Sequence, residues 1–248
     1  MAKISAVIIT FNEEKNIGRC IDSLQNVADD IVVVDSFSTD NTKEICLAKK
    51  VRFIEHEFEG HIEQKNHAIT QAKYTFVLSL DADEALSSAL EKSILDIKEN
   101  PLFDGYTMNR LTNYCGKWIK YCGWYPDTKL RLWNSTKGKW GGINPHDKFI
   151  MVKEVHISHL KGDIEHYSYY TREQHLMQIE KFSTISAKAL FDKKKKTSIF
   201  NLIFNPLASF LKSYIFNLGF LDGTTGFYIC RQSAYANYLK YKKLKELY

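Results

Sequence analysis

The chain has no long apolar run near its beginning. Residues 4–11 are apolar, but Asn12, Glu13 and Glu14 end this stretch, and no small-residue cleavage site follows it. A secretory signal peptide needs a longer apolar core and a cleavage site of that kind. We therefore expect a protein that starts and stays in the cytoplasm.

Cysteines are few, and none are paired in the sequence. There are five of them, scattered along the chain at Cys20, Cys46, Cys115, Cys122 and Cys230. A zinc site or a thioredoxin-type redox site would show two cysteines separated by two residues. The absence of this spacing excludes both kinds of site, and we expect reduced thiols.

A glycine-rich turn is also missing after the first expected strand, residues 4–10. A dinucleotide site or a phosphate-binding loop needs glycines there, because backbone amides must come close to a pyrophosphate. The sequence has Thr10-Phe-Asn-Glu13 at this position. This argues against a nucleotidyltransferase, which would clamp a triphosphate with a basic glycine-rich loop, and another device must hold any phosphate.

The excess of positive charge is small and local. The formal net charge is +5, and lysines gather at residues 193–196 and at Lys240, Lys242, Lys243 and Lys245. Such a run can face nucleic acid, an anionic membrane surface, or solvent along a helix. Charge alone does not choose among the three.

Apolar residues are plentiful and follow an alternating plan. With 44% apolar residues in 248, the chain can bury one large core, or a core with a small appendage. The pattern predicts strands at residues 4–10, 31–35, 51–56 and 74–80, with helices at 12–25, 39–48 and 62–72 between them. Because the strands are apolar runs rich in β-branched residues, we expect an α/β fold with a buried parallel sheet.

Acidic residues follow two of these strands. Asp35 ends the second strand, and Asp81 and Asp83 come directly after the fourth. Ligands of open α/β sheets bind outside the carboxyl ends of the strands. Mg²⁺ and Mn²⁺ prefer carboxylates and substrate phosphates as ligands, so we expect Asp83 to hold such a cation. Taken alone, an Asp-x-Asp pair is more often a turn or a helix cap.

Several segments together resemble glycosyltransferase family 2. They are Thr10-Phe-Asn12-Glu13, Val34-Asp35-Ser-Phe-Ser38-Thr-Asp40-Asn-Thr42, Gln64-Lys65-Asn66-His-Ala68, and Leu80-Asp81-Ala-Asp83-Glu84. Two more, Lys129-Leu-Arg131-Leu-Trp133 and Gly141-Gly-Ile-Asn-Pro-His146-Asp147, resemble the subgroup that contains lipopolysaccharide inner-core β-1,4-glucosyltransferases. The resemblance implies a GT-A fold, which is a Rossmann-like nucleotide-sugar-binding domain with a mixed central sheet, flanking helices and here a C-terminal helical appendage.

The resemblance also implies roles on the donor side. Asp35 accepts a hydrogen bond from the uracil imide, and Thr10, Asn12 and Glu13 form the rest of the base and ribose wall. Lys65 lies against the diphosphate or the base. Many relatives have arginine at that position, and a lysine cannot make the same bidentate contact.

Catalysis is assigned by the same resemblance. Asp81 meets the ribose or the nucleotide, and Asp83 meets the divalent cation. Asp147 is the general base that takes the proton of the acceptor hydroxyl. Relatives more often carry glutamate there, so the shorter aspartate must sit closer to the acceptor.

Four further residues are candidates for ligand binding, and each of them also has a purely structural alternative. His166 reaches the metal or the diphosphate from a C-terminal loop, or it is a packing residue, and the same alternative holds for His146 in the histidine-acid motif. Arg131 contacts a sugar or phosphate, or it is a surface charge. Trp140, next to two glycines, is expected on an acceptor loop, although some of the aromatic residues must belong to the core.

The last third of the chain changes pattern. Apolar residues recur at helical spacing between Ile199 and Leu218, with asparagines and serines among them. We expect a helix that is too polar to cross a bilayer, that Pro206 breaks or kinks, and that lies on a membrane surface or packs on the catalytic domain or a second subunit. A glycine-rich turn and a final helix follow.

Three regions are expected from these patterns. Residues 1–104 form the nucleotide-sugar-binding half, residues 105–190 the acceptor-binding and catalytic-base half, and residues 191–248 the helical appendage. The resemblance implies a metal-dependent, inverting hexosyltransferase with Mg²⁺ or Mn²⁺ as cofactor, a UDP-hexose (UDP-glucose as best choice) as donor and a lipid-linked saccharide such as a core heptose as acceptor.

The alternatives are capsule or O-antigen assembly, a nucleotidyltransferase, and a non-catalytic nucleotide-sugar-binding module. We expect a location on the inner face of the cytoplasmic membrane, and no nucleic-acid partner. A homo-oligomer remains open.

Overall fold

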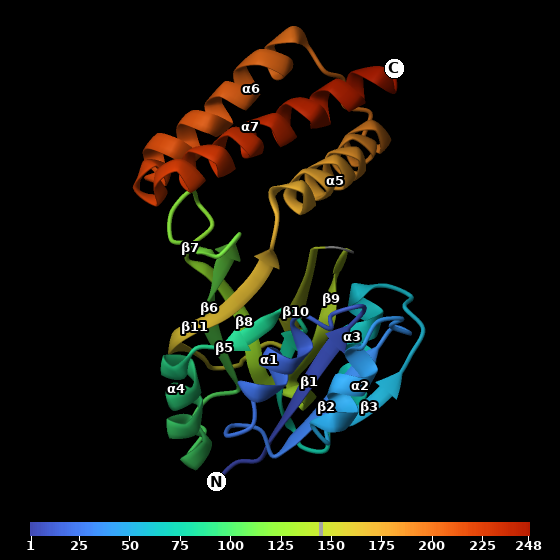
Figure 1. The fold of residues 1–248 in the computed structure, drawn as a ribbon, viewed down its shortest axis with the longest axis vertical. Coiled ribbons are helices and arrows are strands. Elements are labelled where there is room, and N and C mark those ends of the chain that lie inside the picture. Colours follow the sequence, from blue (N-terminus) through green and yellow to red (C-terminus); the bar gives the residue numbers. More distant parts are fainter. Residues whose placement is uncertain (144–145) are drawn as a thin grey trace. The chain divides into compact units, whose positions relative to one another are not determined.

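The chain folds into two compact units in the computed structural model. The structure describes residues 1–143 and 146–248, without the side chains of Ile143 and His146. Unit 1 contains residues 1–110 and 127–167, and unit 2 contains residues 111–126 and 168–248 (Figure 1). The expected regions had boundaries after residues 104 and 190 instead. The division differs because residues 111–126 share a core with the C-terminal helices, far away in sequence.

Most strands join one mixed sheet, in the order β3-β2-β1-β4-β8-β6-β11-β5, with β7 paired to β6. Strands β1 to β4 are parallel, and β8 runs antiparallel to β4. A short hairpin of β9 and β10 stands apart from this sheet. The strands are β1 Ile4–Thr10, β2 Asp30–Asp35, β3 Arg52–Glu55, β4 Phe76–Asp81, β5 Glu84–Leu86, β6 Gly105–Tyr114, β7 Lys117–Ile119, β8 Asp127–Asn134, β9 Gly138–Ile143, β10 His146–Met151 and β11 Ile157–Tyr169.

Helices alternate with the first four strands, as expected, and close the chain. They are α1 Ile17–Asp22, α2 Thr42–Ala48, α3 His61–Thr70, α4 Ser88–Glu99, α5 Arg172–Asp192, α6 Ile199–Leu211 and α7 Gly223–Glu246. Three short helical turns accompany them, at Ser135–Lys137, Lys212–Phe216 and Gly219–Asp222. The first two helices are shorter than predicted because the residues before them form loops that bind each other at the candidate site.

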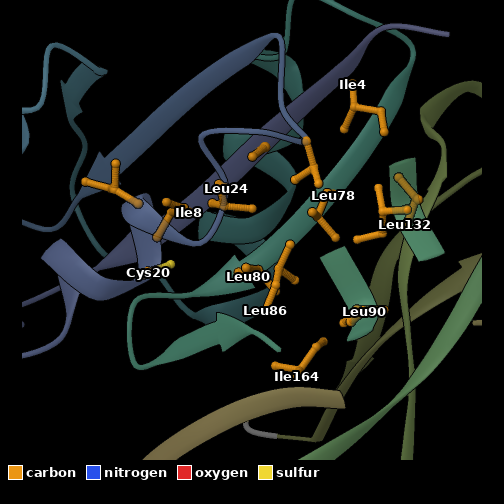
Figure 2. Packing of buried hydrophobic residues seen from close by; sticks show 14 of the residues in the cluster. Ile4, Ile8, Cys20, Leu24, Leu78, Leu80, Leu86, Leu90, Leu132 and Ile164 are labelled. Atoms are coloured by element: carbon orange, nitrogen blue, oxygen red, sulfur yellow. The ribbon is translucent and has the colours of Figure 1, made fainter. Parts of the chain in front are cut away.

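The parallel strands are buried on both faces because their side chains alternate between two cores. On one face, Ile8 of β1 and Leu78 of β4 pack with Cys20 and Leu24 from the α1 segment and Leu90 of α4 (Figure 2). On the other face lies a second core. It contains Val7, Val34, Ala68 of α3, Trp133, and Trp140 and Phe149 of the hairpin. The fold prediction, an α/β GT-A-like arrangement with a mixed sheet and C-terminal helices, is confirmed.

Unit 2 has a core of its own. Tyr114, Ile119 and Cys122 of its β-hairpin pack with Ile229 and Cys230 of α7. The carboxylate of Asp222 accepts hydrogen bonds from the backbone of Lys120 and Tyr121 and so ties the hairpin to the start of α7. All five cysteines are free, which confirms the expected thiols.

Helix α6 departs from its expectation in two ways. Of the expected break or kink at Pro206, the break is wrong, because the helix continues to Leu211. The residues Ile199–Phe216 also have a mean hydropathy of 1.2, and by length and composition they pass as one candidate membrane span. The asparagines and serines among them therefore do not make the segment too polar for a span.

Candidate active site

The candidate site lies at the carboxyl ends of the first parallel strands. Thr10 pairs with Asp35 in the β1–β2 register, and Ile9 pairs with Asp81 in the β1–β4 register. The two aspartates therefore end the strands on either side of β1. Since these ends share one edge of the sheet, the sequence pattern does bring Asp35 and Asp81 to the same place.

The loops after β1 and β2 hold each other. The Asn12 amide donates to Ser38 Oγ at 2.8 Å, and the Thr39 amide donates to Asn12 Oδ1 at the same distance. Asn12 has a φ of 55°, a left-handed conformation that asparagine tolerates better than most residues. The Ser38 amide in turn donates to the buried Asp35 carboxylate at 2.7 Å. These contacts form a wall around Asp35, and Asn12 is part of it.

Thr10 and Glu13 belong to the same wall. Thr10 is buried, and its hydroxyl has no hydrogen-bond partner among the side chains and backbone that the structure describes. The Glu13 amide donates to Thr42 Oγ1 at 2.9 Å. Burial raises the pKa of Glu13 to about 7, against the hydrogen bond from Asn16, and the negative charge of Asp83 adds to the rise. The carboxyl of Glu13 therefore titrates near neutral pH.

A cluster of buried and partly exposed charged side chains lies beside this wall. Lys65 Nζ lies 3.1 Å from Asp81 Oδ1 and 2.8 Å from Asp147 Oδ2. Arg131 Nη2 lies 3.1 Å from Asp81 Oδ2 and 2.8 Å from Glu84 Oε1. The cluster joins α3, β4, β5, β8 and β10, so residues far apart in the sequence share one network of ion pairs.

The charges of this cluster depend on each other. Burial alone would raise the pKa of Asp81, but Lys65 and Arg131 outweigh it and hold the pKa far below its ordinary value. Burial opposes the charge of Arg131, and Glu84 and Asp81 together raise its pKa above the ordinary value. The ion pairs therefore favour the charged form of both side chains. The expected surface alternative for Arg131 is wrong, because the residue is 3% exposed.

Asp83 and His166 form a second, more open pair. His166 Nε2 lies 3.1 Å from Asp83 Oδ2, with side chains 15% and 26% exposed. Burial lowers the pKa of His166, but the charge and hydrogen bond of Asp83 outweigh it, and the net shift is upward. The structure brings these two residues together as expected, although His166 lies on β11 and not on a C-terminal loop.

The pair can be tested as a cation site. Within residues 1–143 and 146–248, no group of three or more histidine, cysteine, aspartate and glutamate side chains is arranged to hold a metal ion. Two neighbouring ligands at about 2.1 Å from an octahedral cation lie about 3 Å apart, close to the observed 3.1 Å. Nδ1 of His166 is buried without a hydrogen-bond partner in the described part of the chain. The two residues fit a cation that takes its other ligands from a diphosphate and water.

Trp140 does not lie on an acceptor loop. It is on β9, 5% exposed, and packs edge-on against Trp133 at 5.5 Å between ring centroids. Its backbone exchanges two hydrogen bonds of 3.0 Å with the Asn66 side chain, and Lys65 Nζ lies 4.6 Å from its ring centroid. A buried ring offers no free face to a sugar, so Trp140 supports Lys65 from the core. The side chain of His146, another expected substrate residue, lies outside the described residues.

Glu84 is the site residue that the sequence analysis left without a role. It is 1% exposed, and its carboxylate accepts from Arg131, from Arg110 at 3.4 Å and from the Asp81 amide at 3.0 Å. Arg110 also pairs with Asp127 at 2.8 Å. One sequence feature could have indicated this role. Glu84 directly follows the Asp-x-Asp pair, and three carboxylates so close together need a positively charged side chain nearby.

Comparisons with known proteins identify the family of the chain. The model of glycosyl transferase family 2 matches residues 5–195. An uncharacterized glycosyltransferase of Rickettsia typhi is 34% identical over 262 aligned positions, which cover 100% of this chain and 88% of that protein. The lipopolysaccharide core biosynthesis glycosyltransferase LpsC of Rhizobium meliloti is 28% identical, covering 90% and 87%. The crystal structure of S. aureus TarS 1–349 with UDP matches with a TM-score of 0.47 and 16% identity, covering 98% and 90%.

Proposed function

Because the chain belongs to glycosyltransferase family 2, we propose that it moves a hexose, with glucose as the best choice, from a UDP-sugar to a lipid-linked saccharide. A heptose of the lipopolysaccharide core is the proposed acceptor, which the name of the relative LpsC supports. The observation that carries the proposal is the meeting of Asp83 with His166 beside the ion pairs of Asp81, Lys65 and Asp147. In this proposal, Asp83 and His166 serve as cation ligands and Asp147 as the base.

On the donor side, Asp35 receives the imide N–H of uracil. Its carboxylate already accepts from the Ser38 amide, but a carboxylate can accept about four hydrogen bonds. Thr10 has a hydroxyl without a partner in the described chain, which a ribose or base atom can satisfy. Asn12 and Glu13 complete the wall in this proposal. Asp81, which Lys65 and Arg131 hold, is the proposed contact of the ribose or the nucleotide.

Asp83 and His166 hold a divalent cation together with the diphosphate of the donor. Such a cation neutralises the negative charge that develops on the leaving diphosphate. An imidazole ligand favours Mn²⁺ over Mg²⁺, which prefers oxygen ligands only. We therefore expect activity with both ions and tighter binding of Mn²⁺.

Transfer is a single displacement with inversion. The acceptor hydroxyl oxygen forms a bond to the anomeric carbon as the bond from that carbon to the diphosphate oxygen breaks. Asp147 takes the proton of the acceptor hydroxyl, and the diphosphate leaves with the electron pair of the broken bond. Lys65 contacts both Asp147 and Asp81, so it fixes the base relative to the nucleotide side of the site. An α-linked donor then gives a β-linked product.

The experiment measures UDP release from a panel of UDP-sugars with core heptose saccharide or undecaprenyl-linked saccharide as acceptor, in Mn²⁺, in Mg²⁺ and in excess EDTA. UDP binding is followed by calorimetry in the same samples. We expect release from one donor, dependent on metal and on the core acceptor. Turnover only with the undecaprenyl-linked acceptor would instead assign the enzyme to capsule or O-antigen assembly.

Three variants separate the roles. Asp83→Asn should weaken metal-assisted UDP binding at least about tenfold, whereas Asp147→Asn should keep this binding and lose at least about a hundredfold of turnover. Asp96→Asn, an exposed carboxylate on α4, is the matched control and should change neither. Metal-assisted UDP binding without turnover by any donor and acceptor would leave a non-catalytic binding module, and absence of UDP binding would overturn the proposal.

A further inference from the structure

Unit 2 carries an exposed apolar stripe on α6 and the helical turn that follows it. Its side chains recur three or four residues apart and are between 38% and 64% exposed, so they share one face of the helix. We call this the α6 face. It consists of Phe200, Ile203, Phe204, Leu207, Leu211 and Ile215.

The α6 face is unusual in extent. No residue of α6 is buried, and only 6% of the window Ile199–Phe216 is buried inside the structure. Large contiguous apolar surfaces rarely face water in soluble proteins, and they mark interaction sites. The rings of Phe200 and Phe204 stack on each other at the N-terminal end of this face, with centroids 5.2 Å apart.

The opposite side of α6 packs against α7. Phe210 and Tyr214 stack on each other and pack edge-on against Phe227 of α7, with centroid distances of 5.9 and 5.7 Å. Figure 1 shows α6 and α7 running side by side. Because α7 carries Arg231 and Lys240, it cannot follow α6 into hydrocarbon without a large desolvation cost. A segment held in this way favours docking in the plane of a bilayer over crossing it.

The charge next to the α6 face points to one kind of partner. Four exposed lysines, at residues 193–196, stand directly before α6, and exposed Lys212 follows it. Residues 193–221 contain no aspartate or glutamate. An apolar helical face with lysines before and after it in the sequence, and with no acidic residue in the same segment, is complementary to an anionic lipid surface.

We propose that the α6 face inserts in the plane of an anionic bilayer, while the lysines at 193–196 bind the lipid headgroups. The surface belongs to unit 2 and not to the sugar-transfer site of unit 1. Its occupancy does not depend on the proposed reaction. A second copy of this chain is the competing occupant, and it has no acidic counterpart within the same segment to pair with the lysines.

The test is flotation of the full-length protein with vesicles of phosphatidylcholine alone or with 30% phosphatidylglycerol. One variant replaces Phe200 and Phe204 by Gln, and a second replaces the four lysines at 193–196 by Gln. The matched control replaces Leu47 and Leu102, which are 55% and 74% exposed in unit 1, by Gln. Circular dichroism and thermal melting check that each variant is folded, and sedimentation reports the oligomeric state.

We expect binding to the anionic vesicles, release by alkaline carbonate, and at least about tenfold weaker partitioning for both variants but not for the control. The lysine variant should also lose the dependence on lipid charge. Equal binding by all folded variants, or absence of vesicle binding, would overturn the proposal. So would resistance to carbonate, which indicates a span, or a dimer that the Phe200 and Phe204 variant dissociates, which indicates a second copy.

Discussion

Single residues in unit 1 differ in whether they face a ligand or hold another residue. Asp83 and His166 are partly exposed and can reach a donor. Glu84 and Arg131 are buried instead: Arg131 pairs with Asp81 and with Glu84, and Glu84 accepts a hydrogen bond from the Asp81 amide. The resemblance implied a nucleotide contact for Asp81, whereas Arg131 was left between a sugar or phosphate contact and a surface charge. The burial of Arg131 indicates instead that it positions Asp81, because a guanidinium shared by two carboxylates has few donors left for a sugar.

Glu84→Gln tests this positioning role. The substitution removes one charge from a buried ion pair and leaves Arg131 with Asp81 as its carboxylate partner, so we expect a loss of about 2–4 kcal/mol in the free energy of unfolding. Because Arg131 should move toward Asp81, UDP binding should also weaken several-fold. Urea unfolding and calorimetry measure the two effects.

The control for this prediction is Glu44→Gln, an exposed glutamate on α2. A surface change of this kind stays within about 0.5 kcal/mol. If Glu84→Gln is equally mild in unfolding, the ion pairs of Glu84 contribute little and the residue does not position Asp81.

At the scale of elements, the sequence predicted best where a pattern is local. Strands β1, β2 and β4 were found from apolar runs, and the acidic residues at their ends fixed one edge of the sheet. Asp83 and His166 are 83 positions apart, and no spacing rule joins them, so only the resemblance suggested the pair. Pro206 misled the prediction because the packing of Phe210 and Tyr214 on α7 stabilises α6 beyond the proline, in spite of its local preference.

Trp140 is a second residue that local sequence did not predict correctly. Two glycines after it suggested a loop, but they lie in the β9–β10 hairpin, where Trp140 pairs with Phe149. Whether an aromatic residue is exposed depends on what packs over it, and here Lys65 and Trp133 come from distant parts of the chain. The sequence analysis expected an acceptor loop at Trp140, where the structure has a buried strand residue.

Helix α5 gives a pH-dependent prediction. His175 accepts or donates a 3.0 Å hydrogen bond with Tyr114, and burial lowers its pKa to about 4. Between pH 6.5 and 4 the unfolded chain binds a proton at this histidine that the folded chain does not. Folding stability should therefore fall as the pH decreases through this window, by about 1–2 kcal/mol once partial hydration of the ring is allowed for.

His175→Gln is the comparison for this effect. Glutamine keeps a hydrogen-bond partner for Tyr114 and cannot titrate, so the difference in unfolding free energy between wild type and variant should shrink from pH 7 to pH 5. Urea unfolding at several pH values measures it. A difference that stays constant across the window would show that His175 does not titrate as the burial of its ring implies.

The whole molecule consists of two units with separate cores, and the chain passes between them after residues 110, 126 and 167. Every residue proposed to touch the donor belongs to unit 1. The exposed α6 face and the titrating His175 belong to unit 2. Because the proposed donor site and the proposed lipid-binding surface lie in different units, a ligand that binds one unit should first stabilise that same unit against local unfolding.

Hydrogen exchange followed by mass spectrometry can check this separation. The proposed donor site lies in unit 1, so UDP with Mn²⁺ should slow exchange in β1, β2 and β4 and leave α5 and α7 unchanged. Asp222→Asn should affect unit 2 alone. Its carboxylate accepts hydrogen bonds from the backbone N–H groups of Lys120 and Tyr121, so exchange should become faster only in β7 and at the start of α7. If either change alters protection equally in both units, the molecule opens as one cooperative body, and docking of α6 on a bilayer would then also change the stability of the donor site.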